Sequence, residues 1–286
     1  MKLQKALSLT LGTLLLTSAL ALPASAMKAI GNVNVPYGSP KIDGKIDAAE
    51  WKNAGTFTVD STTAKSWHIK FPENFSADIR VMWDETNLYL TGTIKDPNVS
   101  FSTEGKYNRD AFQVSIDLGQ TLFNSSENRA IFYSFGCYED GTGMLQRQES
   151  KNDAVVKDGE EGLLMKTVKT SDGWNFETAI PFNMLKTDNK LKSGKTTNVA
   201  AGTKLNMMAC YLDNEGSDTR TSMFGTTLTD ESVAYDWGPK DHGITLVLEA
   251  KKAAPAAAPA TADPAALAIL AAAASGAAVV VSKKRK

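Results

Sequence analysis

Residues 107–119, YNRDAFQVSIDLG, contain the pattern that decides the fold. From Phe112 to Asp117 apolar and polar side chains alternate. Because successive side chains of a β-strand point to opposite faces of the sheet, this period of two predicts a strand with one apolar and one polar face. The polar face, which carries Gln113, Ser115 and Asp117, is either a solvated outer surface or part of a binding site.

The same alternation recurs along the chain between clusters of Gly, Asn, Asp and Pro. The predicted strands are ADIRVMWD, NLYLTGTI, DAFQVSID, RAIFYSFG, GLLMKTVKT, GWNFETAI, KLNMMACYL and GITLVLE. Only residues 48–53 and a single turn at 181–185 have a helical pattern. The pattern therefore predicts an all-β protein, an antiparallel β-sandwich of two sheets.

The first 26 residues have the features of a secretory signal peptide. Lys2 and Lys5 precede an apolar run over residues 6–22, and Ala24 and Ala26 are small residues at cleavage positions. We expect cleavage after Ala26 and export of the remaining chain.

The C-terminal end carries a second targeting pattern. An Ala- and Pro-rich linker over residues 253–264 leads into a hydrophobic anchor with a basic tail, residues 265–286. Seventeen uncharged residues followed by a basic cluster are typical of a membrane stop. Just before them, APATADP at 258–264 resembles the Leu-Pro-x-Thr-Gly signal of sortase substrates, with Pro259 and Thr261 in place. The predicted location is the membrane or cell wall at the surface of a Gram-positive bacterium.

Residues 27–252 form the predicted domain, which carries an excess of about six acidic residues. Such a surface disfavours nucleic acid and anionic lipid as partners. Cys137 and Cys210 each lie in a strand-like run. They could form a disulfide between strands after export or remain as two buried thiols.

The sequence contains no recognisable catalytic motif. His68 and His242 have no neighbour at metal-ligand or Ser-His spacing, and no phosphate-binding loop is present. A pair of carboxylates for glycoside hydrolysis remains open, because such pairs assemble only in space. The expected function is therefore binding rather than catalysis.

The aromatic residues indicate what could be bound, because sugar rings stack on flat aromatic side chains while their hydroxyl groups need polar partners. We expect Trp51, Trp83 and Trp174 to be core residues. Four further aromatics lie in polar, loop-like segments and are either rim packing or a sugar platform. These are Trp67, Tyr107, Tyr235 and Trp237.

Five motifs in order resemble a family 9 carbohydrate-binding module, and the resemblance spans almost all of residues 36–249. They are YGSPKIDGKIDAAEW, ADIRVMWDETNLYLTGTIKDP, YNRDAFQVSID, DGWNFETAIPFNML and AGTKLNMMACYLDNE. The architecture is shared with DOMON-type domains, so the resemblance implies an immunoglobulin- or DOMON-like sandwich. It also implies non-catalytic binding of an oligosaccharide or polysaccharide of glucan or xylan type, such as cellulose or xylan.

The resemblance further implies a site in which two aromatics clamp the terminal sugars. Tyr107 matches the first aromatic, and Trp237, with Tyr235 as the alternative, matches the second. Asp110 matches an Asp of the family, and Gln113 stands where a hydrogen-bonding Glu is usual. Tyr133 stands where an Arg would be expected.

Structural calcium is also implied, with oxygen-rich loops at Asp96, Asp140 and 213–218 as candidates; otherwise these are solvated turn acids. Three other functions remain open from the sequence: a glycan-cleaving enzyme, a surface protein that binds another protein, and a haem-binding electron-transfer domain of DOMON type. The haem would use Met or His ligands. The candidate methionines are Met82, Met144, Met207 and Met208.

Overall fold

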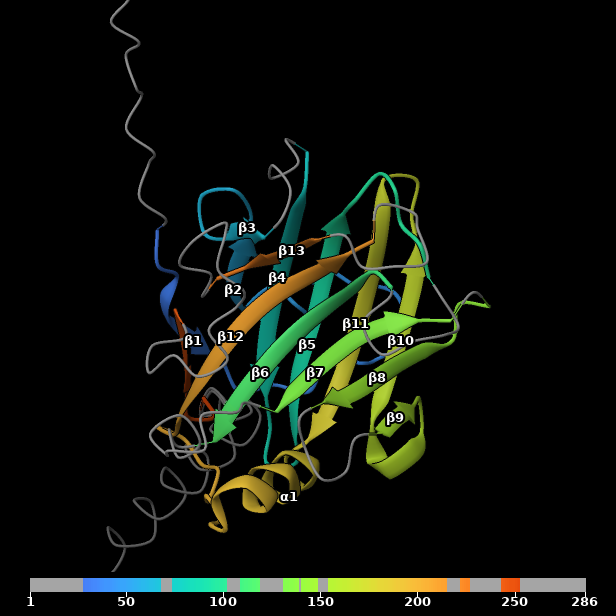
Figure 1. Ribbon diagram of the computed structural model, residues 1–286. Coiled ribbons are helices and arrows are strands. Elements are labelled where there is room, and N and C mark those ends of the chain that lie inside the picture. The colour runs from blue at the N-terminus through green and yellow to red at the C-terminus, as the bar shows by residue number, and fades with distance from the viewer. Residues whose placement is uncertain are drawn as a thin grey trace, which may run out of the picture. The chain divides into compact units, whose positions relative to one another are not determined.

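The computed structural model describes residues 28–67, 74–101, 109–118, 131–138, 140–148, 154–214, 222–226 and 243–252, with backbone only at 67, 137, 148 and 191–193. The chain divides after Ala250 into two units, and all the strands and helices named below lie in the first. In this unit two β-sheets pack face to face, and a helix lies across one end of them (Figure 1). The predicted β-sandwich is confirmed.

The larger sheet has nine strands within the described ranges. Its order is β1-β14-β12-β6-β7-β8-β9, with β13 beside β12 and β3 beside β13. The strands are β1 (Gly31–Val35), β3 (Lys65–Trp67), β6 (Ala111–Leu118), β7 (Phe132–Cys137), β8 (Gly143–Gln148), β9 (Ala154–Lys157), β12 (Lys204–Asp213), β13 (Ser222–Gly225) and β14 (Ile244–Leu248).

The smaller sheet is antiparallel throughout and has the order β10-β11-β5-β4-β2. Its strands are β2 (Gly55–Val59), β4 (Ser76–Trp83), β5 (Asn87–Lys95), β10 (Leu164–Lys169) and β11 (Gly173–Pro181). A single turn of 3-10 helix, η1 (Glu160–Gly162), lies between β9 and β10.

One strand pair contradicts the prediction of a wholly antiparallel sandwich, because β1 pairs with β14 in parallel. These strands are the first and the last of the described fold, so no hairpin turn connects them. An antiparallel direction is required only where a tight turn joins two strands. All eight predicted strands are confirmed, whereas β1, β2, β3, β8, β9 and β13 were not predicted because they are short or alternate weakly.

The main core lies between the sheets and confirms the apolar face predicted for the strand over 111–118. Phe112, Val114 and Ile116 of β6 all belong to it. Phe112 stacks on Phe176 of β11 with ring centroids 5.6 Å apart. Gly92 of β5 pairs with Phe176, and a Cβ atom there would collide with the phenyl ring, so only glycine leaves room for this packing.

The three tryptophans predicted to be core residues are buried, which confirms that prediction. Trp83 and Trp174 lie in the main core, where Trp174 Nε1 donates to the Tyr211 hydroxyl at 3.2 Å. Trp51 lies instead on the outer face of the smaller sheet. A hairpin follows Trp83 and joins β4 to β5, with Asp84 accepting hydrogen bonds from the backbone of Thr86 and Asn87.

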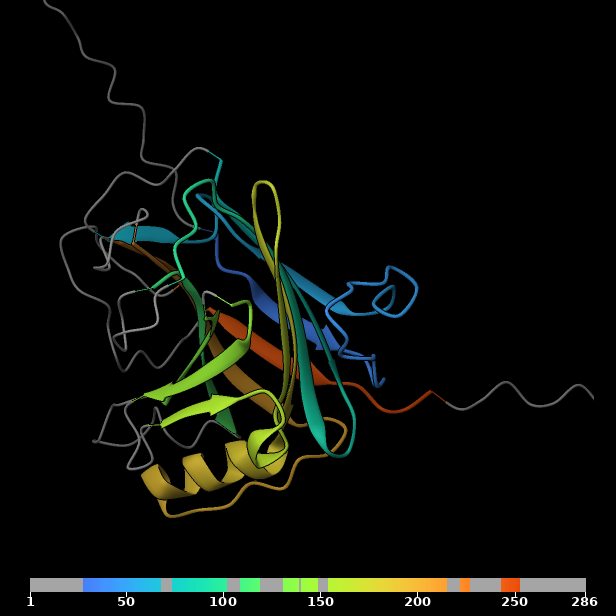
Figure 2. The ribbon, with the colours of Figure 1, turned by 90° about the vertical axis from the view of Figure 1, so that its right-hand side faces the viewer.

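The segment over residues 36–54 covers the outer face of the smaller sheet (Figure 2). Trp51 packs there with Met82, Tyr89 and Ala179. Within this segment Gly44 has a φ of 86°, a conformation that favours glycine. The helix predicted over 48–53 is wrong, because these residues form turns rather than a continuous helix.

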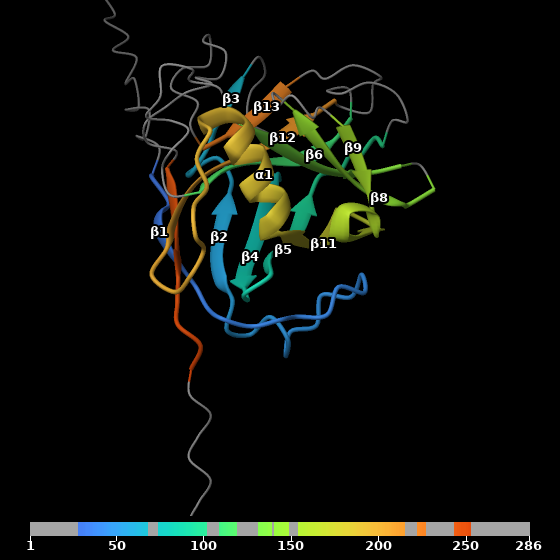
Figure 3. The same cartoon turned by 90° about the horizontal axis from the view of Figure 1, so that it is seen from below.

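Helix α1 (Phe182–Ser193) crosses one end of the sandwich (Figure 3). It corrects the prediction of a single turn at 181–185, and it ends where Gly194 adopts φ 69°. The face that packs on the sheets includes polar Asp188 and Asn189, both buried. Asn189 Oδ1 accepts a 3.0 Å hydrogen bond from the backbone of Leu118. Phe182, Met184 and Leu185 in the first turn of the helix belong to the main core, whereas Asp188 and Asn189 in the next turn are polar. The apolar period therefore revealed only the first turn.

No helix in the described part of the chain is long and apolar enough to cross a membrane. The predicted signal peptide, linker and anchor lie outside the described residues and stay predictions.

Candidate functional site

The polar face of β6 points away from the main core, on the outer side of the larger sheet, which Figure 1 views face on. Gln113 is 2% exposed, and Ser115 and Asp117 are 0% exposed. A solvated outer surface is therefore wrong as an explanation of this polar face. Buried polar groups are costly unless they have hydrogen-bond partners, so the face requires a structural or functional reason.

Gln113 belongs to a row of neutral polar side chains across three neighbouring strands. Gln113 of β6 pairs with Ser134 of β7, and Ser134 pairs with Gln146 of β8. Directly paired residues of antiparallel strands share one face of the sheet. Gln113 Nε2 donates a 2.9 Å hydrogen bond to Ser134 Oγ. We call Gln113, Ser134 and Gln146 the amide row.

Two buried oxygens on this face have no hydrogen-bond partner in the described structure. They are Ser115 Oγ and Gln146 Oε1. Native proteins leave few such groups, so each requires an explanation, and two on one sheet face fit a ligand site. Four other buried atoms without a partner lie elsewhere in the described structure. An uncharged molecule rich in hydroxyl groups would match this chemistry, because a hydroxyl can both donate and accept.

Apolar side chains lie on the same face, beside the polar ones. They form a cluster of Ala111, Phe132, Met208, Cys210, Leu212 and Met223. Cys210 pairs with Gln113 across β12 and β6, so the amide row ends at this cluster. The face thus combines hydrogen-bonding groups with apolar surface, as sugar-binding sites do.

Of the five predicted sugar-binding residues, the structure describes Asp110 and Gln113. Tyr107, Tyr235 and Trp237 lie outside the described residues, and their clamp stays a prediction. Gln113 lies on the polar face as its place in the alternation predicted. Trp67 was expected in a loop, but its backbone belongs to β3.

Asp110 lies at the start of β6 and has other described partners. Its Oδ2 accepts the backbone N–H of Ser100 at 2.5 Å, and its Oδ1 accepts that of Asn214 at 2.9 Å. These two bonds connect the start of β6 to the segments that follow β5 and β12. Its predicted contact with sugar stays a prediction, while these bonds give it a structural role.

Tyr133, which stands where an Arg would be expected, does not face the amide row. Tyr133 belongs to the main core and is fully buried, and its hydroxyl donates to Asp188 Oδ2 of α1 at 3.1 Å. Burial raises the pKa of Tyr133 well above its ordinary value. The neighbouring Ser134 occupies the binding face instead, because adjacent residues of a strand point in opposite directions.

Ser134 and Gln146 were not predicted as site residues. Ser134 lies in a predicted strand, so the alternation could have placed it on a face once the pairing with β6 was known. Gln146 lies in β8, whose sequence GMLQRQ was not predicted as a strand. No local signal connects either residue with Gln113; only the register does.

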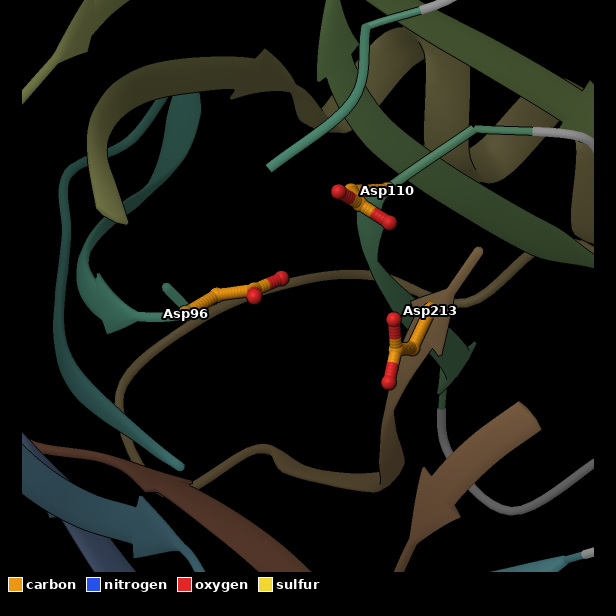
Figure 4. Close-up of side chains that lie close together, drawn as sticks. All are labelled: Asp96, Asp110 and Asp213. Atoms are coloured by element: carbon orange, nitrogen blue, oxygen red, sulfur yellow. The ribbon is translucent and has the colours of Figure 1, made fainter. Parts of the chain in front are cut away.

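Three buried aspartates form a second candidate site. Asp96, Asp110 and Asp213 come from three different segments and converge, with one carboxylate oxygen of each within 4.8 Å of the others (Figure 4). Burial, and next the charge of Asp96, raises the pKa of Asp110 to about 8. In the described structure no lysine or arginine pairs with Asp96 or Asp110.

This donor set suits a hard cation, because calcium prefers carboxylate and carbonyl oxygens. Asp96 Oδ2 also accepts the Tyr211 hydroxyl at 2.6 Å, which connects the cluster to Trp174 in the main core. Of the other candidate calcium loops, Asp140 is exposed and accepts the backbone N–H of Thr142, as a solvated turn acid does. Residues 215–218 lie outside the described residues.

Two alternatives left open by the sequence can now be weighed. Cys210 carries a buried thiol that is not part of a disulfide, which contradicts a disulfide with Cys137. The methionines considered as haem ligands do not gather at one place: Met82, Met207 and Met208 lie in three separate apolar clusters. The candidate histidines lie outside the described residues.

Comparison with curated proteins relates the chain to parts of larger enzymes. Endo-1,4-beta-xylanase C of Paenibacillus barcinonensis is 29% identical over 203 residues, which are 69% of this chain and 17% of that enzyme. Endo-1,4-beta-xylanase A of Thermotoga neapolitana is 30% identical over 152 residues, 52% of this chain and 13% of that enzyme. The chain therefore spans less than a fifth of the length of these relatives.

Solved structures and a family match agree with the fold. A family 9 carbohydrate-binding module from Caldicellulosiruptor kristjanssonii in complex with cellotriose matches with a TM-score of 0.53 at 18% identity, over 80% of this chain and 98% of that one. The complex with glucose matches with a TM-score of 0.54 at 17% identity, over 79% and 100%. The description "carbohydrate family 9 binding domain-like" matches residues 42–243. Because that match covers most of the chain, the protein belongs to the carbohydrate family 9 binding-domain family, as its motifs predicted.

Proposed function

We propose that this protein binds uncharged glucan- or xylan-type oligosaccharides, without turnover, on the outer face of the larger sheet. The observation that carries the proposal is the amide row together with the unpartnered oxygens of Ser115 and Gln146. Membership in a family of carbohydrate-binding domains supports binding rather than catalysis. The cellotriose and glucose in related structures, and the xylanases among the relatives, support the choice of sugar.

The binding chemistry follows from the neutral character of the amide row. Amide and hydroxyl groups donate to and accept from ring hydroxyls without the desolvation penalty of a charged group. Tyr107 and Trp237, with Tyr235 as the alternative, would supply stacking surfaces for the sugar faces. Neutral hydrogen bonds are weaker than charge-assisted ones, so the affinity should be modest, with a Kd in the micromolar to millimolar range.

Titration calorimetry with cello- and xylo-oligosaccharides tests this function. We expect heat of binding that corresponds to a free energy of about −4 to −8 kcal/mol. Chromatography of the same mixtures after long incubation should show unchanged oligosaccharides. The absence of binding to every glucan and xylan tested, or the steady appearance of shorter products, contradicts the proposal.

We also propose that a divalent cation, calcium by its ligand preference, occupies the cluster of Asp96, Asp110 and Asp213. Support comes from three buried carboxylates within 4.8 Å of one another and from the raised pKa of Asp110. The cation would neutralise their repulsion and hold together the ends of β5, β6 and β12. Calorimetric titration of the metal-free protein with calcium tests this assignment.

Export and attachment at the cell surface form the last part of the proposal. They rest on the signal-like residues 1–26 and on the linker and basic-tailed apolar segment over 253–286. Fractionation of the producing cells, with mass spectrometry of both ends of the chain, tests them. A protein found inside the cell with its first 26 residues intact would refute this part.

A further inference from the structure

Gln146 and Ser115 lie at opposite sides of the proposed sugar site, and no motif of the sequence drew attention to Gln146. Gln146 belongs to β8 and is 3% exposed, whereas Ser115 belongs to β6 and is 0% exposed. The intervening strand β7 places Ser134 beside Gln146 and Phe132 beside Ser115. With strands about 4.8 Å apart and about 6.8 Å between alternate residues, the two backbone positions are roughly 12 Å apart.

We propose that Gln146 is a specificity-determining residue of the sugar site, with Ser115 as its counterpart on the far side of β7. Gln146 Oε1 accepts, and Ser115 Oγ accepts or donates, a hydrogen bond to a ring hydroxyl of the bound sugar. The proposal rests on the proposed function, since it names further contacts of that same site. It extends the site across the sheet, from β6 to β8, rather than along β6 alone.

The physical argument is that both oxygens lack a partner in the described structure while they are shielded from water. Such a group destabilises the free protein and is retained where a ligand completes it. Both atoms lie on the face that carries the amide row, and Gln146 is itself the last member of that row. Since both are shielded in the free protein, this face must open before a sugar reaches them.

The chemistry of the face also selects among sugars. Gln146 Oε1 can only accept a hydrogen bond, so it favours a hydroxyl over a carboxylate, which has no proton to donate at neutral pH. A neutral glucose or xylose unit is therefore preferred to a uronic acid unit.

The decisive experiment compares sugar affinity and thermal stability in three variants of the purified protein. Gln146→Leu and Ser115→Ala remove the unpartnered oxygens with little change of shape. Thr178→Val is the matched control, because Thr178 Oγ1 is also buried without a partner but lies on β11, on the face shared with core residues Phe176 and Ile180. Calorimetry with cellobiose and xylobiose gives affinity, and thermal melts without sugar give stability.

We expect Gln146→Leu to bind the disaccharide about five- to tenfold more weakly, which is the worth of one hydrogen bond, while its melting temperature stays level or rises. Ser115→Ala should behave in the same way with a smaller loss. Thr178→Val should also keep or raise its melting temperature, but its affinity should equal that of the wild type. Deoxy derivatives of cellobiose, each of which lacks one hydroxyl group, identify the hydroxyl that Gln146 contacts. One derivative should bind the wild type more weakly than cellobiose does, whereas Gln146→Leu should bind that derivative and cellobiose equally well.

Failure of the inference and failure of the proposed function give different results. If the wild type binds no sugar, the proposed function fails and this inference fails with it. If the wild type binds and both Gln146→Leu and Ser115→Ala bind equally well, only the inference is overturned, and internal water is the partner of these oxygens. If Gln146→Leu does not fold, two other variants decide: Ser115→Ala and Gln146→Glu, which keeps an acceptor oxygen. A loss of affinity in Ser115→Ala, with affinity retained in Gln146→Glu, supports the inference. Unchanged affinity in Ser115→Ala overturns it.

Discussion

The outer faces of the two sheets are both buried, but they are built differently. On the smaller sheet Trp51 packs in an apolar cluster, and buried Glu177 accepts Trp51 Nε1 at 3.0 Å and the backbone N–H of Gly44 at 2.8 Å. On the larger sheet the amide row and Ser115 include oxygens that have no partner in the described structure. Buried polar groups that are satisfied, as Glu177 is, serve stability, whereas a row of polar groups with unsatisfied oxygens is suited to a ligand. On the smaller sheet, Asn175 Oδ1 is one further oxygen without a partner in the described structure.

The largest expected effect is on stability, and it concerns Trp51 on the outer face of the smaller sheet. Trp51→Ala should destabilise the protein by about 3 to 5 kcal/mol, because it opens a cavity and removes a hydrogen bond from buried Glu177. Sugar affinity per folded molecule should stay unchanged. Urea denaturation measures the first quantity and calorimetry the second. A clear loss of affinity in Trp51→Ala would show that the two faces do not act separately.

The acidic cluster at the edge of the larger sheet should make stability depend on pH and on calcium. Without calcium, the pKa of Asp110 is about 8 in the folded protein. In the unfolded chain it should have its ordinary value of about 3.9. The folded state therefore holds this proton more tightly, and stability is lost as the pH rises toward 8. The loss between pH 5 and pH 8 should be at most about 4 kcal/mol, since each pKa unit is worth about 1.4 kcal/mol.

Calcium should reverse this loss and raise the melting temperature more at pH 8 than at pH 5. The gain is about 2.7 kcal/mol at a hundredfold excess over Kd. Asp213→Asn should lose the calcium response, while Asp140→Asn, at an exposed turn, should keep it. Melting curves in chelator and in calcium at both pH values provide the measurement. Equal melting curves in calcium and in chelator would contradict the proposed calcium site.

The predicted aromatic clamp should affect binding and not folding, which is the reverse of Trp51. Tyr107→Ala and Trp237→Ala should each cost about 2 to 3 kcal/mol of binding free energy, so affinity falls at least tenfold. Stability should change little. If Trp237→Ala binds normally, Tyr235→Ala should carry the loss. Wild-type binding in all three variants, measured by calorimetry, would leave the amide row without a clamp.

The smallest expected effect concerns the centre of the amide row. Gln113→Ala should weaken sugar binding by about 1 kcal/mol, or roughly fivefold, because it removes a neutral hydrogen-bonding group. Glu177→Gln on the smaller sheet is the control and should leave affinity unchanged. Calorimetry with cellobiose separates the two. Similar affinity losses in both variants would mean that Gln113 acts only through the scaffold.

The fold could be predicted well where the pattern is local. Alternation identified eight strands, the core position of Trp83 and Trp174, and the polar face on which Gln113 lies. Helix α1 was underestimated, since its apolar contacts come from Phe182, Met184 and Leu185 in the first turn and the next turn packs through hydrogen bonds of Asn189. The parallel pairing of β1 with β14 was missed because no turn connects the two strands.

The candidate site was predictable only in part, for a related reason. Gln113 follows from alternation and from the family resemblance, but Ser134 and Gln146 join it only through the register of β6, β7 and β8. Tyr133 stands where the resemblance expects an Arg but belongs to the core, because the order of motifs in sequence does not say which of two adjacent residues faces outward. A shift of one residue moves a side chain to the other face of the sheet.

By itself the sequence determined the class of fold, the strands with strong alternation and membership in a carbohydrate-binding family, because these depend on the order of residues along a single segment. The tertiary structure decided which polar groups meet: the amide row, the unpartnered oxygens of Ser115 and Gln146, and the convergence of Asp96, Asp110 and Asp213. Each of these sets joins residues from strands or loops far apart in the chain. Their proximity depends on strand pairing and sheet packing, which are set by the burial of the whole core and not by any local pattern.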